Sequence, residues 1–418
     1  MDSLLRAHAE EIVRAAIRAV MPDAAVQRAL GGMRFSGRVR LVAAGKAAWQ
    51  MAKAAADCLG NRIEAGVVIT KYGHVRGPIA NFTCYEGGHP LPDGNSFRAT
   101  RAALDLVSGL REEDTVLFLL SGGGSALFEQ PRIPAEELRR INERLLACGA
   151  DIVEINTIRK RLSAVKGGRF ARLCAPARIE AVILSDILGD PVDMIASGPV
   201  SADPTTAEDA RRIAAKYGLT LSEQAAALLD EETPKRVDNV RTQVTGSVSA
   251  LCAAAADACA QLGYEPILLT DRLCCEAAEA GRMLASVVKA HSGEGRSLAF
   301  LAGGETVVRL TGHGLGGRNQ ELALAAAEGI AGLPGVCVFS VGSDGTDGPT
   351  DAAGGYVDGQ TRSALRAAGL DPAGVLREND SYHALKQVGG LIVTGPTGTN
   401  VNDVAVALIR RQEKESTG

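Results

Sequence analysis

The stretch "LFLLSGGGSALFEQP", residues 117–131, decides the fold class, because an apolar run ends there in three consecutive glycines. A short apolar run that stops at a glycine turn is typical of a buried strand in a parallel sheet. Three adjacent glycines cost conformational entropy, so the backbone is expected to approach another group closely at this turn. The stretch therefore predicts a strand that leads directly into a ligand-binding loop.

Similar apolar runs recur through the first half of the chain, and each ends at glycine or a small polar residue. They are "RVRLVAAG" (38–45), "AGVVITK" (65–71), "DTVLFLLSG" (114–122) and "IEAVILSD" (179–186). Helical segments rich in alanine separate them, which is the pattern of parallel strands joined by crossover helices. We predict a Rossmann-like α/β fold with a mostly parallel sheet, whose ligands bind where strands end and helices begin.

A chain of 418 residues is long for one hydrophobic core, so two domains are expected. The polar stretch "LDEETPKRVDNVR" (229–241) interrupts the alternation, and we place the boundary between residues 1–240 and 241–418. The pattern then restarts as a second α/β domain. Its expected strands are "GYEPILLT", "RSLAFLAGG", "ETVVRLTG", "GVCVFSVGSD" and "GGLIVTG", and its expected helices include "RNQELALAAAEGI" and "VNDVAVALIRR".

The composition excludes several classes of function. A net charge of −4 and an aromatic content of 4% argue against a general nucleic-acid or membrane binder. The first twenty residues combine helical periodicity with charges, so they resemble neither a signal peptide nor a membrane anchor. The nine cysteines show no CxxC spacing and indicate thiols in a reducing cytoplasm.

The turn in "LVAAGKAAWQMAKAA" (41–55) places Lys46 between an expected strand and an expected helix. It is not a P-loop, because Arg40 and Ala47 stand where that motif needs glycine and Ser or Thr. An ammonium group at such a turn can bind a phosphate or a carboxylate. The alternative, a solvated lysine, stays open on this stretch alone.

Two further stretches suit anion binding. The loop of residues 121–125 would offer backbone N–H groups and two hydroxyls to an anion, from Ser121, Gly122, Gly123, Gly124 and Ser125. "INTIRKRLSAVKGGRFARL" (155–173) contains six basic residues and no acidic one, among them Arg159 and Lys166. Lys166 is followed by Gly167 and Gly168, which combines positive charge with an open backbone. A solvated basic face remains the alternative there.

Carboxylates follow another expected strand in "LSDILGDPVDMIASGP" (184–199). Asp186 and Asp190 are candidates for holding a hydrated cation or for accepting a hydroxyl proton. For Asp193 we favour turn and capping chemistry. His89 follows a strand in "EGGHPLPDGNS", but the sequence does not decide its role.

The segment "FLAGGETVVRLTGHGLGGRNQELALAAA" (300–327) contains a GxGxxG match at Gly312, Gly314 and Gly317. A dinucleotide site is one interpretation. It ranks second, because the helix opens with the bulky Arg318 and because Asp344 lies 27 positions beyond Gly317, later than usual. Arg318 is better suited to gripping a carboxylate or phosphate.

The loop "GSDGTDGPTDAAGG" (342–355) holds three aspartates, Asp344, Asp347 and Asp351. Their spacing does not fit an EF-hand, and a few carboxylates at a strand end suit Mg²⁺ brought by a nucleotide. The alternative is a loop of turn-forming aspartates. In "LIVTGPTGTNVNDVAVALI" (391–409), Thr397, Thr399 and Asn400 are expected to cap a helix and to offer donors to an anion.

Taken together, the chain resembles the glycerate 2-kinases with a MOFRL C-terminal domain. The motifs that carry the resemblance occur in order over nearly the whole chain: "AAGKAAWQMA", "LLSGGGSAL", "IRKRLSAVKGGRFA", "ILSDILGDPVDMIASGP", "GGETVVRLTGHGLGGRNQELAL", "GSDGTDGPTDAAGG" and "TGPTGTNVNDVAVAL". The resemblance implies two α/β domains with an active site in the cleft between them. It also implies transfer of the ATP γ-phosphoryl group to D-glycerate, giving 2-phosphoglycerate.

On this interpretation Lys46, Asp190 and Arg318 would be catalytic, and Asp186 would hold Mg²⁺ together with the three aspartates of residues 342–355. The glycine loop, Arg159, Lys166 and Gly167 would bind substrate or nucleotide, and so would Glu305 and Asn319 from the same motif as Arg318. Two alternatives stay open: an NAD(P)H-dependent hydroxypyruvate reductase, and a sensor that binds phosphorylated metabolites without turnover. Homo-oligomerisation is also open.

Overall fold

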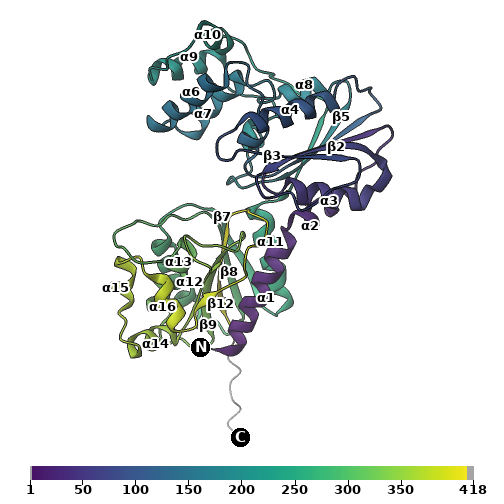
Figure 1. The fold of residues 1–418 in the computed structure, drawn as a ribbon. Helices are drawn as coiled ribbons and strands as arrows, with labels where there is room; N and C mark the ends of the chain where they lie inside the picture. Colours follow the sequence, from purple (N-terminus) through teal and green to yellow (C-terminus); the bar gives the residue numbers. More distant parts are fainter. Residues whose placement is uncertain (1, 412–418) are drawn as a thin grey trace. The chain divides into compact units, whose positions relative to one another are not determined.

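The computed structural model describes residues 2–411, which form two compact units (Figure 1). Pro22–Thr245 make one, here called the central unit. The chain before Pro22 joins the chain after Thr245 to make the other, here called the terminal unit. The boundary expected at 240/241 therefore lies inside strand β6 (Val240–Gly246), and the first helix belongs with the C-terminal half.

The central unit is built on a six-stranded sheet of order β3-β2-β1-β4-β5-β6. Its other strands are β1 (Val39–Ala44), β2 (Ile63–Lys71), β3 (Phe82–Gly87), β4 (Thr115–Leu120) and β5 (Arg178–Leu184). Strands β1 to β5 pair in parallel, which confirms the expected Rossmann-like sheet. All six residues of β4 are buried, because apolar clusters cover both faces of the sheet.

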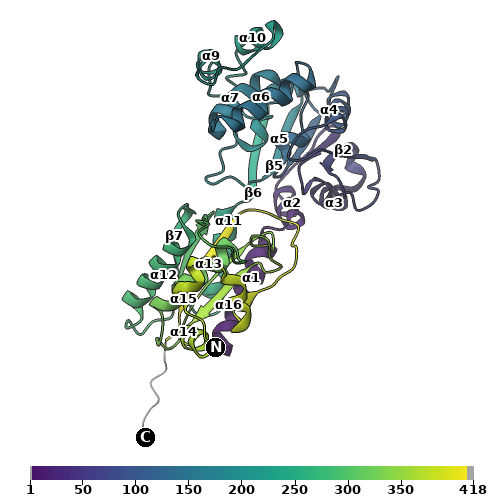
Figure 2. The same cartoon turned by 60° about the vertical axis from the view of Figure 1, so that its left-hand side comes forward.

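Helices surround this sheet and also form a separate group beside it. The helices are α2 (Pro22–Leu30), α3 (Ala48–Leu59), η1 (Gly60–Arg62), α4 (Gly94–Leu106), α5 (Gly124–Leu127), α6 (Ala135–Ala147), α7 (Ile152–Leu162), α8 (Arg169–Cys174), η2 (Ile195–Ser197), α9 (Ala207–Lys216) and α10 (Glu223–Leu229). Figures 1 and 2 show α6, α7, α9 and α10 together. They share an apolar cluster of their own, so they pack as one helical layer.

The terminal unit has a mixed six-stranded sheet of order β11-β10-β9-β12-β8-β7. The strands are β7 (Glu265–Leu273), β8 (Leu298–Gly304), β9 (Val336–Gly342), β10 (Gly354–Asp358), β11 (Leu391–Ile392) and β12 (Asp403–Ile409). Only β7 and β8 pair in parallel, and the other pairs are antiparallel. This unit is α/β as expected, although its sheet is mixed.

Two sequence expectations about this unit were wrong. "VNDVAVALIRR" does not form a helix, because β12 inserts between β8 and β9 with all seven residues buried. Thr397, Thr399 and Asn400 consequently cap no helix. "ETVVRLTG" is not a strand either and makes one isolated bridge, between Glu276 and Val307. When both faces of an element are buried, a short apolar run lacks the periodicity that distinguishes a strand from a helix.

The helices of the terminal unit are α1 (Ser3–Ala19), α11 (Val248–Gln261), α12 (Ala277–His291), α13 (Arg318–Gly329), α14 (Thr361–Ala367), α15 (Pro372–Arg377) and α16 (Ser381–Gln387). Helix α1 lies beside α11, as both views show (Figures 1 and 2). Its apolar residues at helical spacing, from Leu5 to Ile17, are buried there. Within residues 2–411, no helix combines the length and apolar composition needed to cross a membrane.

Candidate functional site

The ends of β1 and β4, which are neighbours in the central sheet, hold Lys46 and Ser121 together. The Lys46 amide donates to the Gly122 carbonyl at 2.8 Å, and the Ala47 amide donates to the Ser121 hydroxyl at 3.0 Å. A Cβ atom on Gly45 would lie 2.3 Å from Ser121 Oγ, so only glycine allows this contact. The sequence correctly expected Lys46 in the turn between a strand and a helix.

The three-glycine turn is where functional side chains from separate segments meet. A Cβ on Gly122 would lie 2.3 Å from Asp186 Oδ2, and one on Gly123 would lie 3.0 Å from the His89 ring and 3.2 Å from Lys46 Cγ. Gly123 also has a φ of +85°, which other residues rarely adopt. The glycines therefore let Lys46, His89 and Asp186 approach the backbone at one point.

The surroundings of His89 at this turn favour the neutral form of its imidazole. Burial lowers its pKa below the ordinary value, and the positive charges of Lys46 and Lys71 lower it further. The sequence left its position undecided, and the structure brings it to the glycine turn.

Asp190 sits in a tight left-handed turn after β5. Gly189 and Asp190 have φ values of +80° and +53°, and the Asp190 amide donates to the Ile187 carbonyl at 3.1 Å. Its Oδ1 atom is buried and accepts no hydrogen bond from any described residue. A buried carboxylate oxygen without a partner is costly and marks a position that a ligand can satisfy.

A second left-handed turn, residues 196–198, packs against the glycine loop. Ala196 and Ser197 have φ values of +50° and +60°. The Ser197 hydroxyl donates to Asn156 at 2.8 Å and lies 3.4 Å from the Ser125 hydroxyl. Asn156, which the sequence gave no reason to select, therefore helps to hold Ser125 in place.

The basic segment of residues 155–173 contacts the backbone of this loop. Arg159 donates to the Ser125 carbonyl at 3.2 Å, and burial lowers the pKa of its guanidinium despite the charge of Glu129. Its Nε atom is buried without a partner among the described residues. Arg159 therefore contacts the glycine loop directly.

Lys166 is fully buried and ties the two loops together. Its ammonium donates to the carbonyls of Ser125 at 2.8 Å, Phe128 at 3.1 Å and Ala196 at 3.4 Å, and it lies 3.5 Å from Glu129. Burial lowers the pKa of Lys166 to about 8. The side chain therefore holds the backbone of the loops.

Gly167 and Gly168 do not present an open backbone. Their amides donate to the carbonyls of Ser197 at 2.9 Å and Gly198 at 2.7 Å. Both have positive φ values, which the turn requires. Nearby, Asp193 forms an ion pair with Lys160 at 3.3 Å, in keeping with a structural part for Asp193.

In the terminal unit, Arg318 forms an ion pair with the buried Asp403, which lies at the start of the inner strand β12. Arg318 donates through Nε and Nη2 to both oxygens of Asp403, at 2.5 and 3.1 Å, and through Nη1 to Glu305 at 3.1 Å. Burial alone would lower the pKa of Arg318, but Asp403 raises it above its ordinary value. Burial raises the pKa of Asp403 to about 6 against the effect of Arg318, so the pair is ionised at neutral pH.

The strand order explains this position. β12 pairs with β8 and β9, and Asp403 lies opposite Gly304 and Gly342 at the ends of those strands. A Cβ on Gly342 would lie 3.3 Å from Asp344 Oδ1 and 3.4 Å from Asp403 Oδ1. Asp344 and Asp403 thus face the same strand end. The sequence missed Asp403 because its segment was assigned to a helix.

Asp347 caps helix α13. Its carboxylate accepts hydrogen bonds from the amides of Asn319 at 3.1 Å and Gln320 at 2.9 Å, and from both of their side chains. The side-chain oxygen of Asn319, Oδ1, accepts a hydrogen bond from the Ser340 hydroxyl. Both Asp347 and Asn319 are buried, so they form the internal support of the helix start.

The GxGxxG glycines pack against the protein's own chain. Cβ atoms on Gly312, Gly314 and Gly317 would lie 2.2–2.4 Å from atoms of Glu378, Asp380 and Asp347 respectively. The Asp347 carboxylate occupies the N-terminus of α13, where a dinucleotide fingerprint places its pyrophosphate. The match is therefore explained by packing and does not favour a dinucleotide site.

The three aspartates of residues 342–355 have separate partners. Asp344 accepts from the Thr346 amide at 3.0 Å, Asp347 caps α13, and Asp351 accepts from the Tyr382 hydroxyl at 2.8 Å. Among residues 2–411, no three His, Cys, Asp or Glu side chains form a group that could hold a metal ion by themselves.

Comparison with known families covers most of the chain. Residues 8–230 match the domain of unknown function DUF4147, and residues 298–403 match the MOFRL family. The chain is 52% identical to a protein from Thermotoga maritima named D-glycerate 2-kinase, over 97% of this chain and 98% of that protein. It is 43% identical to one from Pyrococcus horikoshii named glycerate 2-kinase, over 90% of this chain and 88% of that protein.

A further relative, from Agrobacterium vitis, carries a hydroxypyruvate reductase name and is 41% identical over 95% of this chain and 93% of its own. Among solved structures, the fold is similar to a glycerate kinase from Thermotoga maritima, with a TM-score of 0.94 at 52% identity over 97% of this chain and 99% of that one. Sequence motifs, both family matches and the fold agree: the chain belongs to the MOFRL-domain glycerate 2-kinase family.

Proposed function

We propose that the protein transfers the γ-phosphoryl group of ATP to the 2-hydroxyl of D-glycerate, giving 2-phosphoglycerate and ADP with the help of Mg²⁺. The observation that carries the proposal is the 52% identity, along nearly the whole chain, to a protein named D-glycerate 2-kinase. The same likeness supports the 2-hydroxyl as acceptor.

Phosphoryl transfer needs mainly positioning and neutralisation of charge, with little covalent chemistry from the protein. Lys46 beside the glycine turn would bind the transferring phosphoryl group or the glycerate carboxylate. Residues 121–125 would supply donors to the phosphate oxygens, and Arg159 would add positive charge behind Ser125. Lys166, which bonds three carbonyls of these loops, would keep that arrangement rigid.

Asp190 is the proposed general base. Its buried Oδ1 has no partner among the described residues, so it is available to accept the proton of the attacking hydroxyl. The left-handed turn at residues 189–190 fixes this carboxylate relative to β5. The lowered pKa of His89 disfavours a competing positive charge at the turn.

The carboxylates present fit a Mg²⁺ ion that arrives with its nucleotide. Mg²⁺ is usually held by one or two carboxylates together with substrate phosphates and waters, so a group of three protein ligands is not required. Asp186, whose carboxylate lies against Gly122, would be its ligand in the central unit. The ion would supply neutralisation of the phosphoryl oxygens.

Arg318 is proposed to hold a substrate carboxylate or the transferring group through Nη1. Asp403 already engages Nε and Nη2, so only the Nη1 side, now facing the half-exposed Glu305, can exchange partners. Glu305 would then leave Arg318 when an anion arrives. Asn319 and Asp347 would contribute by fixing the helix that carries Arg318.

Lys46→Ala tests this proposal, with Lys53→Ala as a matched control. Lys53 lies on helix α3, which follows Lys46, but its side chain is exposed and paired with Asp57. We expect Lys46→Ala to lower kcat/KM by about 10²-fold or more, because an interaction with transferring charge is lost, and Lys53→Ala to leave it unchanged. Full kcat and KM in Lys46→Ala would overturn the role of Lys46.

A parallel reaction with hydroxypyruvate and NADH or NADPH tests the alternative activity. The capped N-terminus of α13 leads us to expect no cofactor oxidation. Oxidation without any phosphorylation of D-glycerate would reverse the order of the two proposals.

A further inference from the structure

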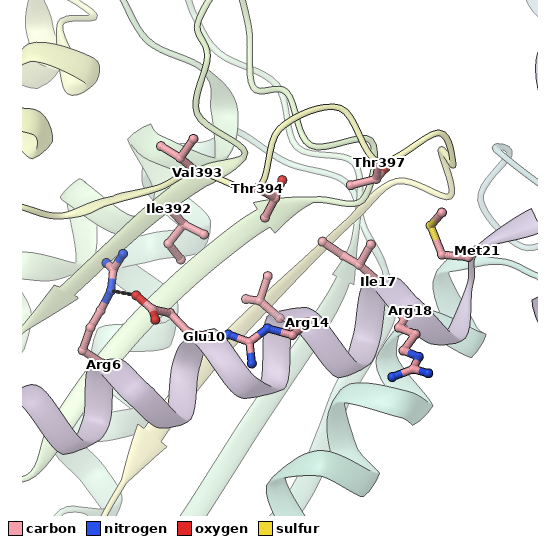
Figure 3. A pocket seen from close by; sticks show the side chains of 11 residues that line it. Arg6, Glu10, Arg14, Ile17, Arg18, Met21, Ile392, Val393, Thr394 and Thr397 are labelled. Carbon is pink, nitrogen blue, oxygen red and sulfur yellow. Dashed lines mark hydrogen bonds and ion pairs between the residues drawn. The ribbon is translucent and has the colours of Figure 1, made fainter. Parts of the chain in front are cut away.

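A cavity of about 570 Å³ lies in the terminal unit, between helix α1 and the segment after β11 (Figure 3). Residues 393–402, "VTGPTGTNVN", form that segment, which we call the strap. The cavity belongs to the size class of small-molecule sites. None of the candidate catalytic residues described above lines it.

One wall of the cavity is positively charged. Arg6, Arg14 and Arg18 line it, and Glu10 is the only acidic residue among its lining side chains. Glu10 already pairs with Arg6 at 2.8 Å, as the dashed line in Figure 3 marks. The side chain of Arg14 makes no hydrogen bond or ion pair in the part of the chain that the structure describes. The wall therefore carries an excess of positive charge.

Arg6 carries a further sign of a missing anion. Its Nε donates to Glu10 and its Nη2 donates to the Leu391 carbonyl at 2.8 Å, but its Nη1 is buried without a partner among the described residues. A buried guanidinium nitrogen is expected to have an acceptor. The guanidinium now stacks over the Tyr356 ring, with Cζ 5.2 Å from the ring centroid, so the side chain must turn toward the cavity before an anion there can be that acceptor.

The floor of the cavity is apolar, and the opposite wall holds two threonines whose hydroxyls donate to the backbone carbonyls of Gly395 and Ser343. Val13, Ile17 and Ile392 are buried side chains of the lining, while Thr394 and Thr397 come from the strap. Figure 3 shows the strap residues across the cavity from α1. An apolar floor favours a ligand with a carbon skeleton over a bare inorganic ion.

The strap connects this cavity to the Arg318–Asp403 pair. The Thr397 amide donates to the Asp344 carbonyl at 3.1 Å, and the Val401 amide donates to the Ser343 hydroxyl at 2.8 Å. The strap also ends directly at Asp403, the partner of Arg318. A ligand that fixes the strap would therefore act on Asp344 and Asp403 through covalent continuity and two hydrogen bonds.

We propose that this cavity binds a small organic phosphate, whose phosphate group pairs with Arg14 and Arg6 while its carbon skeleton rests on Val13, Ile17 and Ile392. Occupancy orders the strap and thereby changes the kinetic parameters of the enzyme. The binding itself does not depend on the proposed function, because it is measured without turnover.

The test is calorimetric titration of the full-length protein with glucose 6-phosphate and, separately, with inorganic phosphate. D-glycerate and a non-hydrolysable ATP analogue are present at saturation, so that the proposed substrate site is already filled. We expect one equivalent of glucose 6-phosphate to bind, more tightly than inorganic phosphate. In Arg14→Ala its affinity falls at least about tenfold, the effect of losing one charged hydrogen-bonded contact.

Two control variants keep the outcome interpretable. Arg377→Ala removes an exposed arginine of the same unit that does not line this cavity, and it should bind as the unaltered protein does. Lys46→Ala removes a candidate catalytic residue and should also retain binding. Because Arg14 is exposed, its removal leaves the core of α1 intact.

Three results would overturn the proposal. They are an absence of glucose 6-phosphate binding to the unaltered protein, equal affinity in Arg14→Ala, and equal affinity for inorganic phosphate. If binding is supported, kcat or KM for D-glycerate should shift with glucose 6-phosphate concentration, and this shift should disappear in Arg14→Ala. An unchanged kcat and KM at saturating glucose 6-phosphate would overturn the action on the strap.

Discussion

At the scale of single residues, Lys166 shows how burial sets a charge that the loops depend on. Its pKa is lowered from 10.5 to about 8, and its ammonium bonds the carbonyls of three residues around the glycine loop. The pattern Lys-Gly-Gly pointed to this lysine. It could not show whether the ammonium binds an anion or holds the protein's own backbone. Only the positions of residues 125, 128 and 196 distinguish the two.

Lys166 predicts a pH dependence. We expect kcat/KM to fall above pH 8 with an apparent pKa of about 8, because deprotonation weakens the bonds that hold the loops. In Lys166→Arg this alkaline fall should disappear, since arginine stays charged. A pH–rate profile between pH 6.5 and 10 measures both.

The same group would not cause unfolding in that range. Because the pKa of Lys166 is depressed in the folded protein, the unfolded chain binds more protons between pH 8 and 10.5. Its contribution to the free energy of unfolding therefore rises with pH there. An alkaline loss of activity that accompanies loss of the circular dichroism signal, or that persists in Lys166→Arg, would speak against this account.

Asp403 and Glu305 give a matched pair of carboxylates on one arginine. Asp403 is buried and grips Arg318 with both oxygens, whereas Glu305 is half-exposed. Asp403→Asn should lower the free energy of unfolding by about 1–2 kcal/mol, because Arg318, whose side chain is one-third exposed, then keeps only Glu305 as a counter-charge. Glu305→Gln should change it by less than about 1 kcal/mol, the usual size for an exposed pair.

Urea denaturation at pH 7.5 measures both changes. Equal effects of the two substitutions would mean that burial does not distinguish these carboxylates, contrary to the geometry described here.

At the scale of elements, the sequence predicted those strands whose ends carry glycines. β1, β4 and β5 follow from apolar runs, and the structure brings Lys46 and Asp186, which follow β1 and β5, to the turn after β4. β12 could not be predicted, because its seven buried residues show no alternation between two environments. For the same reason, Asp403 was not predicted as a site residue.

For the loop of residues 342–355, the sequence left a metal site and a set of turn-forming aspartates as open alternatives. Its spacing of three aspartates suits a metal site as well as a set of turns and caps, and the choice depends on the distant partners Gln320 and Tyr382. Sequence spacing alone does not reveal such long-range partners. The GxGxxG match likewise depends on distant partners, because its glycines pack against residues 378–380 and 347.

Gly123→Ala tests whether the glycine turn serves the site or only the backbone. Gly109→Ala is the matched control, since Gly109 also has a positive φ, of +67°, but open space around it. Each substitution should lower the free energy of unfolding by about 1 kcal/mol or somewhat more through the left-handed backbone. Only Gly123→Ala should lower kcat/KM, because its Cβ displaces His89 and Lys46.

Steady-state kinetics and thermal denaturation of the two variants provide the comparison. If Gly109→Ala impaired kcat/KM as strongly as Gly123→Ala, the convergence of side chains at the turn would lose its functional meaning.

At the scale of the whole molecule, the sequence predicted two α/β domains and the family, and both are confirmed. It assigned the first helix to the N-terminal half because chain order was the only guide. The structure instead buries the apolar face of α1 in the terminal unit, where Thr399 bonds to the Val20 carbonyl at 2.8 Å. Because Val20 and Thr399 are 379 positions apart, no local sequence pattern predicts this contact.

The most direct test of the central claim is phosphorus NMR of the product formed from D-glycerate, ATP and Mg²⁺ by the purified protein, with an EDTA control. The account predicts 2-phosphoglycerate, formed only when the metal is present. Exclusive formation of 3-phosphoglycerate, or no phosphorylation of D-glycerate at all, would contradict it.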